Sequence, residues 1–178
     1  MKRFIHFYLL ILLWLVVFTT NLQAFTYERI GEFGSVYYQL HNAITHTGTT
    51  TATLIHSKII EGGKLTENGT VVIITGWEYD QNDADTKTCA VMAGGTVLTT
   101  INGANNRSSR VFTSLHNVNS YASQIAPPSG IQGFGNSTAT MQTLSINTLQ
   151  TWTIDWYATL ADATDSVKLR FVEMWIYP

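Results

Sequence analysis

Charged side chains are scarce in this sequence, and their scarcity limits what the chain can be. Only 12% of the 178 residues are charged, against roughly 25% in an average globular protein. Exposed helices usually carry many Lys and Glu residues, so the composition disfavours a helical protein and suits β-sheets joined by polar turns. No run of basic residues follows Lys2 and Arg3. Because phosphate backbones are bound by clustered cations, nucleic acid is not an expected partner.

Cysteine is almost absent too, since Cys89 is the single one. A single cysteine cannot form an intramolecular disulfide, so its thiol is either buried or bonded to the cysteine of another chain. Cys89 opens the apolar run 89–92, which favours burial. The sequence has no Gly-x-Ser-x-Gly elbow and no evident base for Cys89, so we expect no enzyme and no cofactor. A pair of opposed carboxylates for glycoside hydrolysis stays open among the acidic strand residues, which are Glu78, Asp80, Asp155 and Glu173.

The N-terminus has the layout of an export signal. Lys2 and Arg3 precede a nearly continuous apolar run over residues 4–18, and Ala24 offers a small residue for cleavage. The run is short for a bilayer span of about twenty residues. We therefore expect a signal peptide or signal anchor over residues 1–24 and one domain over residues 25–178. The protein is expected outside the cell, secreted or on the cell surface, or else membrane-anchored.

From residue 25 onward the hydrophobic period is two rather than 3.6, which indicates strands. Gly94-Gly95 predicts a hairpin and Asn68-Gly69 a tight turn. The predicted strands are 36–44, 53–60, 71–79, 87–92, 96–101, 109–117, 121–125, 138–146, 151–159 and 167–177. Strands of this length and spacing predict an all-β fold, an antiparallel jelly roll or β-sandwich.

The order of several turn motifs resembles a jelly-roll module of phage virions. The segment 54–71 has a strand ending in Ile60, a glycine turn, Leu65 and then Asn68-Gly69 before a β-branched strand. Further matches follow in the same order: Lys87 before Gly94-Gly95, Asn117 before Gln124, Gly133-Phe134-Gly135, Asn147-Thr148 before Trp152-Thr153-Ile154, and 161–166 before the last strand. The resemblance covers roughly residues 50–178. It implies a tail-fibre, head-fibre or decoration-like protein, often trimeric.

Aromatic and acidic residues supply the candidate ligand sites. Tryptophan and tyrosine rings can stack on sugars, and the candidates are Trp77, Tyr79, Trp152 and Trp156, although such rings also fill cores. The loop 80–85 places oxygen donors at alternate positions, so Asp80, Asp83 and Asp85 are candidate calcium ligands, with a solvated turn as the alternative. The histidines His41, His46 and His56 lack the i, i+2 spacing that puts two metal ligands on one strand face.

The last strand is unusually aromatic and points to self-assembly. Strand alternation places Leu169, Phe171, Trp175 and Tyr177 on one face, which predicts a central strand or a subunit interface, because an exposed edge of this kind invites aggregation. We expect a structural or adhesive homo-oligomer, a trimer on the family resemblance, with a host-surface glycan or other virion proteins as further partners. A secreted carbohydrate-binding module is the alternative, and a small β-sandwich enzyme is a third.

Overall fold

The computed structural model describes residues 26–30, 36–80, 85–103, 107–128 and 140–178. These residues form β-strands and no helix, which confirms the all-β prediction. The strands are β1 (Thr26–Ile30), β2 (Val36–Leu40), β3 (Ile44–Thr47), β4 (Thr53–Ile60), β5 (Thr70–Tyr79), β6 (Lys87–Ala93), β7 (Thr96–Gly103), β8 (Ser108–Asn117), β9 (Gln124–Ala126), β10 (Gln142–Leu144), β11 (Trp152–Thr159) and β12 (Ser166–Tyr177). No stretch of the described chain forms a helix suited to spanning a membrane. The predicted targeting segment, residues 1–24, lies outside the described residues.

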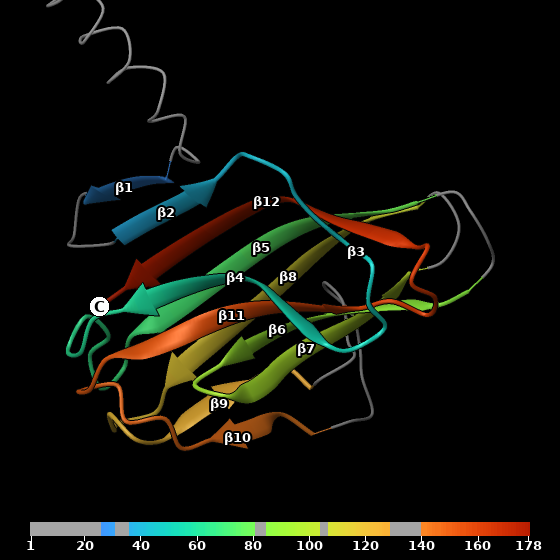
Figure 1. Ribbon diagram of the computed structural model, residues 1–178. Helices are drawn as coiled ribbons and strands as arrows, with labels where there is room; N and C mark the ends of the chain where they lie inside the picture. The colour runs from blue at the N-terminus through green and yellow to red at the C-terminus, as the bar shows by residue number, and fades with distance from the viewer. Residues whose placement is uncertain (1–25, 31–35, 81–84, 104–106, 129–139) are drawn as a thin grey trace, which may run out of the picture.

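The strands pack as two antiparallel layers (Figure 1). One sheet has the order β1-β2-β12-β5-β8-β9-β10, and β3 also pairs with β12. The other has the order β4-β11-β6-β7. The four strands β2-β12-β5-β8 therefore face the four strands β4-β11-β6-β7, with the chain crossing repeatedly between the layers. This arrangement is a jelly roll, as the sequence predicts.

The core lies between the layers because alternate side chains of each strand are apolar. In β11 the buried and half-buried positions alternate without a break, which turns Trp152, Ile154 and Trp156 inward. From the opposite layer β5 contributes Val71 and Ile73. Burying each of these aliphatic side chains contributes roughly 1.5–3 kcal/mol before the entropy cost of folding.

Several strands differ from the sequence prediction: β1 was not predicted, the predicted strand 121–125 is reduced to β9, and two more differ as follows. The predicted strand 36–44 is divided into β2 and β3, which pair with different halves of β12. The division falls opposite a β-bulge of β12 between Leu169 and Phe171. The predicted strand 138–146 is reduced to β10, and its first two residues lie outside the described part. The Gly94-Gly95 hairpin is confirmed, and both glycines adopt positive φ, 51° and 81°, which costs glycine little.

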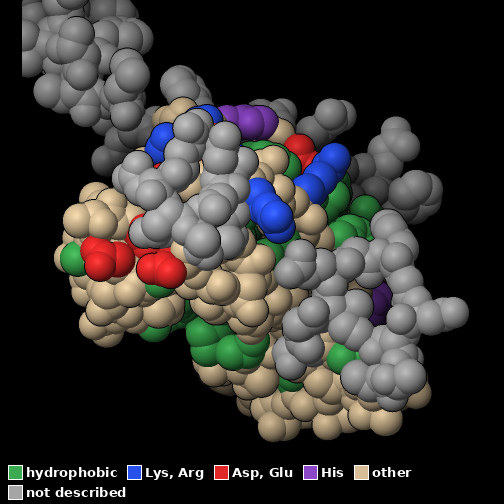
Figure 2. Space-filling model, turned by 90° about the vertical axis from the view of Figure 1, so that its right-hand side faces the viewer, with side chains coloured by type: hydrophobic (Ala, Val, Ile, Leu, Met, Phe, Trp, Pro, Cys, Tyr) green, Lys and Arg blue, Asp and Glu red, His purple; other side chains and the backbone are tan. Residues whose placement is uncertain are grey.

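Figure 2 looks at the side of the molecule that lies to the right in Figure 1. Among the described residues of this face, uncharged polar side chains and backbone predominate, and basic and acidic side chains stand in small separate groups. Among its described residues this face shows no cluster of cations of the kind that a phosphate backbone requires.

Candidate functional site

The aromatic residues predicted to bind a ligand fill the core instead. Trp77, Tyr79, Trp152 and Trp156 are 1%, 1%, 6% and 0% exposed. All four occupy inward positions of β5 and β11, where ring burial stabilises the contact between the two layers. They present no ring face to a ligand in solution, which corrects the prediction.

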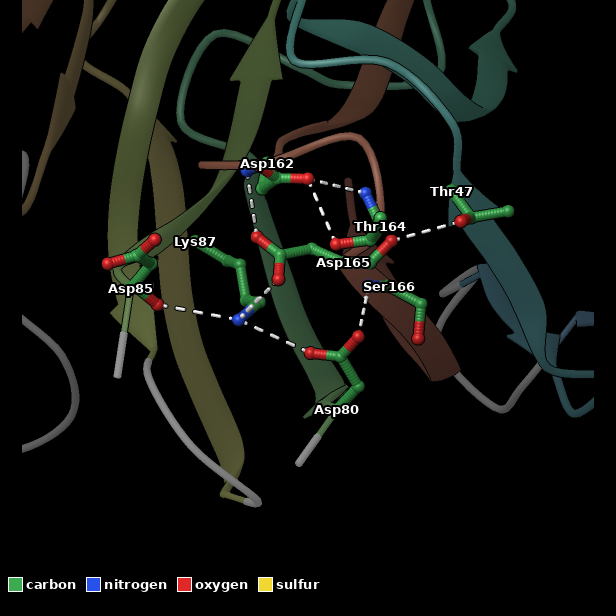
Figure 3. Close-up of polar contacts among 8 residues, drawn as sticks. All are labelled: Thr47, Asp80, Asp85, Lys87, Asp162, Thr164, Asp165 and Ser166. Carbon is green, nitrogen blue, oxygen red and sulfur yellow. Dashed lines mark hydrogen bonds and ion pairs between the residues drawn. The ribbon is translucent and has the colours of Figure 1, made fainter. Parts of the chain in front are cut away.

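The two described ends of the acidic loop, Asp80 and Asp85, both contact the ammonium of Lys87 (Figure 3). The Lys87 ammonium is fully buried and lies 3.2 Å from Asp80 Oδ1 and 3.1 Å from Asp165 Oδ1. It also donates to the backbone carbonyl of Asp85 at 3.4 Å. Within the described ranges no three His, Cys, Asp or Glu side chains are grouped to hold a metal, and Asp83 lies outside them. The Asp80 carboxylate and the Asp85 backbone carbonyl contact the Lys87 ammonium, and the calcium site, which includes Asp83, stays a prediction.

Asp165, which sequence analysis did not connect with this loop, is held by the turn before β12 (Figure 3). Its Oδ2 accepts a hydrogen bond from the Asp162 backbone N–H at 2.9 Å, and its carbonyl accepts one from the Thr47 hydroxyl. The Asp162 carboxylate in turn accepts hydrogen bonds from the Thr164 N–H and hydroxyl, which lower the pKa of Asp162. These contacts fix the Asp165 carboxylate against Lys87. We call Lys87, Asp80 and Asp165 the ion cluster.

The opposite end of the sandwich is closed by neutral groups. Gln124 donates to Asn117 Oδ1 and to the Ile146 carbonyl, both at 3.0 Å, and accepts from the Ile146 N–H at 2.8 Å. Asn117 also donates to Thr66 O and to the Thr148 hydroxyl. Asn117 and Gln124 are the pair quoted in the phage resemblance, and the structure shows them in contact. We call Asn117, Gln124, Ile146 and Thr148 the amide network.

The bulge in β12 divides the residues predicted as one interface. Leu169 is fully buried on the inner face of the sheet. After the bulge, Phe171, Trp175 and Tyr177 lie on the outer face, where Tyr177 is 46% exposed. The prediction is corrected for Leu169, because one extra residue in a strand moves every later side chain to the other face.

Apolar side chains of neighbouring strands surround these three on the outer face of the larger sheet. Strand register places Tyr37 and Val72 beside Trp175, and Ile74 and Phe112 in the adjacent row. These four are half-buried. We call the whole set the outer patch, and its members are Tyr37, Val72, Ile74, Phe112, Phe171, Trp175 and Tyr177.

The rings and charges of the outer patch are ordered. The Tyr37 and Trp175 rings lie 5.1 Å apart, centroid to centroid, and are tilted by 37°. Partial burial and the nearby Glu173 carboxylate raise the pKa of Tyr37. At one end of the patch, Arg110 lies over the Phe171 ring at 5.9 Å.

A second polar group marks the open edge of the sandwich, where β4 faces β2. The Tyr38 hydroxyl and His56 Nε2 are 2.6 Å apart, and the Lys58 ammonium lies 4.7 Å from the centre of the Tyr38 ring. Burial raises the pKa of Tyr38 to about 12, and burial together with Lys58 lowers the pKa of His56. At neutral pH, a neutral His56 and a protonated Tyr38 therefore share one hydrogen bond.

A shallow pocket of about 330 Å³ lies beside this edge. Its floor is formed by Met174 and Ile176 and its rim by charged residues of the turn after β4, including Glu61 and Lys64, which form an ion pair at 3.7 Å. Glu61 and Lys64 at the rim are exposed.

Cys89 is buried, as the sequence predicts. Burial raises the pKa of its thiol to about 12. Since the thiolate is the reactive form, Cys89 is a packing residue of β6.

No protein-family model matches the chain, and no curated protein matches it. Among solved structures, the chain is similar to a protein of Bacillus endospore appendages, described as a family of disulfide-linked pili (14% identity, 88% of this chain and 96% of that chain covered, TM-score 0.44). It is also similar to the CBM36-1 domain of a multidomain xylanase from the hindgut metagenome of Trinervitermes trinervoides (11%, 85% and 86%, TM-score 0.38). A third is the CBM2 module of the evolved Dit of Lactobacillus casei BL23 phage J-1 (8%, 85% and 80%, TM-score 0.36). These are likenesses of β-fold only.

Four of the seven members of the outer patch were not predicted from the sequence, although one signal for them is present. The run Val71-Val72-Ile73-Ile74 is apolar at odd and even positions alike, so β5 has apolar side chains on both faces of the sheet. A strand with only one buried face alternates with polar residues. A continuous apolar run in a strand therefore indicates a second covered face.

Proposed function

We propose that this chain is a non-enzymatic structural or adhesive module that assembles with its own copies through the outer patch. The observation that carries the proposal is the row of aromatic and aliphatic side chains on the outer face of the central strands β2, β12, β5 and β8. A face with this composition is typical of the buried centre of a protein interface.

The size of the outer patch suits the centre of an interface with a second copy. At about 3.3 Å per residue and about 4.8 Å between strands, the part of β12 from Phe171 to Tyr177 and the width of four strands give an area of roughly 440 Å². A stable interface buries about 800 Å² on each partner. A second copy of the chain can therefore cover the outer patch and also contact the charged side chains around it, whereas a short peptide would leave most of the patch in water.

Charges of both signs border and interrupt the patch, which suits self-association. Glu173 lies between the rows of Phe171 and Trp175, and Arg110 lies at the Phe171 end. At the same end Glu78 pairs with Lys168 at 3.4 Å and also with Arg170, and these contacts lower the pKa of Glu78. A surface with both signs can pair its acids with the bases of an identical surface.

The test is the mass of the intact chain in solution, measured by light scattering at micromolar concentration. We expect a homo-oligomer, with a trimer as the state that the phage resemblance implies. Trp175→Ala should give smaller particles and keep a β-type circular dichroism spectrum, because it removes a hot-spot ring. Ile59→Ala is the matched control, since Ile59 is 60% exposed on β4 of the other sheet, and it should leave the mass unchanged.

A wild-type chain that runs as a monomer would sink the proposal. So would an Ile59→Ala variant that dissociates as readily as Trp175→Ala. Phe171→Ala supplies a second variant for the case in which Trp175→Ala does not fold.

A carbohydrate-binding module is the second candidate, and the Tyr37–Trp175 ring pair favours it. Two tilted rings on one sheet face offer a platform on which a sugar can stack. For this function the chain would be a monomer, and a glycan array would show binding that Trp175→Ala removes.

A further inference from the structure

The ion cluster has the composition and placement of a cross-link site. Lys87 opens β6 in one sheet, and Asp165 directly precedes β12 in the other. Both side chains are fully buried, and Asp80 approaches the same ammonium from the end of β5. Three elements thus bring an amine and two carboxylates together away from water (Figure 3).

The two ion pairs of the cluster are long for buried charges. The Nζ–O distances of 3.1 and 3.2 Å exceed the 2.7–2.9 Å usual for charge-assisted hydrogen bonds. Asp80 Oδ1 and Asp165 Oδ1 accept no well-oriented hydrogen bond in the described structure. Buried ions are costly without good geometry, and an amide formed between Lys87 and Asp165 would remove both charges.

We propose that Lys87 and Asp165 condense to an intramolecular amide that joins the two sheets. The Lys87 amine attacks Asp165 Cγ, the new N–C bond forms, and the Cγ–Oδ1 bond breaks. One water leaves, carrying Oδ1. The ammonium and the carboxylate disappear together, so atoms and charge balance and no other reactant is needed.

The surrounding groups are placed for each step of this reaction. Asp80 can take the proton from the attacking nitrogen and pass it to the departing oxygen, as a general base and then a general acid. The Asp162 N–H, 2.9 Å from Asp165 Oδ2, stabilises the charge that develops on that oxygen. Oδ2 remains as the amide carbonyl, and the new amide N–H stays beside Asp80 Oδ1. Fixed proximity of the reacting groups replaces external activation.

The inference is independent of the proposed assembly, because the cluster lies inside one chain. Its consequence is mechanical: the C-terminal strand β12, central in its sheet, becomes covalently tied to β6 of the opposite layer. A module exposed outside the cell would gain resistance to unfolding from such a closed loop.

The experiment is mass spectrometry of the denatured full chain. We expect a mass lower by one water than the sequence requires for the observed N-terminus. A protease digest should yield a branched peptide that joins the segment of Lys87 to the segment of Asp165. Asp80→Asn should fold with the full mass and no branched peptide, because the proton carrier is gone.

Lys168 and Glu78 are the internal control. Their atoms lie 3.4 Å apart but are more than one-third exposed, so they should appear in separate linear peptides. The proposal is overturned if wild-type Lys87 and Asp165 are also recovered in linear peptides at full mass. A branched peptide in Asp80→Asn would overturn the role of Asp80. If Asp80→Asn does not fold, the wild-type mass decides alone.

Discussion

The two ends of the sandwich bury polar groups in opposite ways. At one end the ion cluster places Lys87 between two carboxylates, at distances longer than ideal. At the other end the amide network has no charge, and Gln124 alone makes three buried hydrogen bonds of 2.8–3.0 Å. A neutral network with all its partners serves to fix loops. A buried ion cluster with long ion pairs places an amine and a carboxylate in contact, which is the arrangement that the proposed amide requires.

Removing the cation should have the larger effect on stability. Lys87→Met leaves the buried Asp165 carboxylate and the mostly buried Asp80 carboxylate without their cation and also removes the proposed amide, so the free energy of unfolding should fall by at least about 3–5 kcal/mol. Urea titration followed by circular dichroism would measure the change. Lys168→Met, at a half-exposed ion pair, should cost under about 1 kcal/mol. Equal effects of the two substitutions would contradict the expectation that the buried ion cluster contributes more to stability than the half-exposed ion pair.

Breaking the amide network should cost somewhat less. Gln124→Met keeps the side-chain volume but leaves the Ile146 N–H and carbonyl and Asn117 Oδ1 without their partner. Because an unpaired buried polar group costs about 1–3 kcal/mol and neighbours relax in part, a loss of about 2–3 kcal/mol is expected in the same titration. Gln150→Met, at an exposed position, should stay within about 0.5 kcal/mol. A Gln124→Met variant as stable as wild type would show that water replaces the network.

The comparison also shows what sequence can predict. Period-two alternation was enough for most of the strands and for an all-β fold of the jelly-roll or β-sandwich type, since each strand's burial follows its own residues. The contact of Lys87 with Asp165 could not be predicted, because it depends on β6 and β12 meeting at one end of two sheets. The bulge before Phe171 was equally hidden, since it depends on pairing with β5. Trp77 and Trp156 were assigned to the wrong environment because a ring's type does not say which face it occupies.

The smallest expected effect is local and concerns acid. The pKa of Asp162, near the ion cluster, lies below its ordinary value of 3.8 because the Thr164 N–H and hydroxyl bind the carboxylate. A lowered folded pKa means that the folded state holds fewer protons, so this stabilisation is complete above the ordinary value and is lost as the pH falls through the lowered one.

Hydrogen exchange at individual amides would therefore separate the two ends of the sandwich. After correction for intrinsic exchange rates, protection of the Thr164 amide should fall as the pH drops below 3.8, the ordinary pKa of Asp. Protection of the Ile146 amide, bonded to the uncharged Gln124, should stay constant over the same range. In Asp162→Asn the side chain keeps an acceptor oxygen but no longer titrates. Protection of the Thr164 amide should therefore become independent of pH. Parallel loss at Thr164 and Ile146 in the wild type would mean that acid loosens the whole sandwich, and the two ends would then form one cooperative unit.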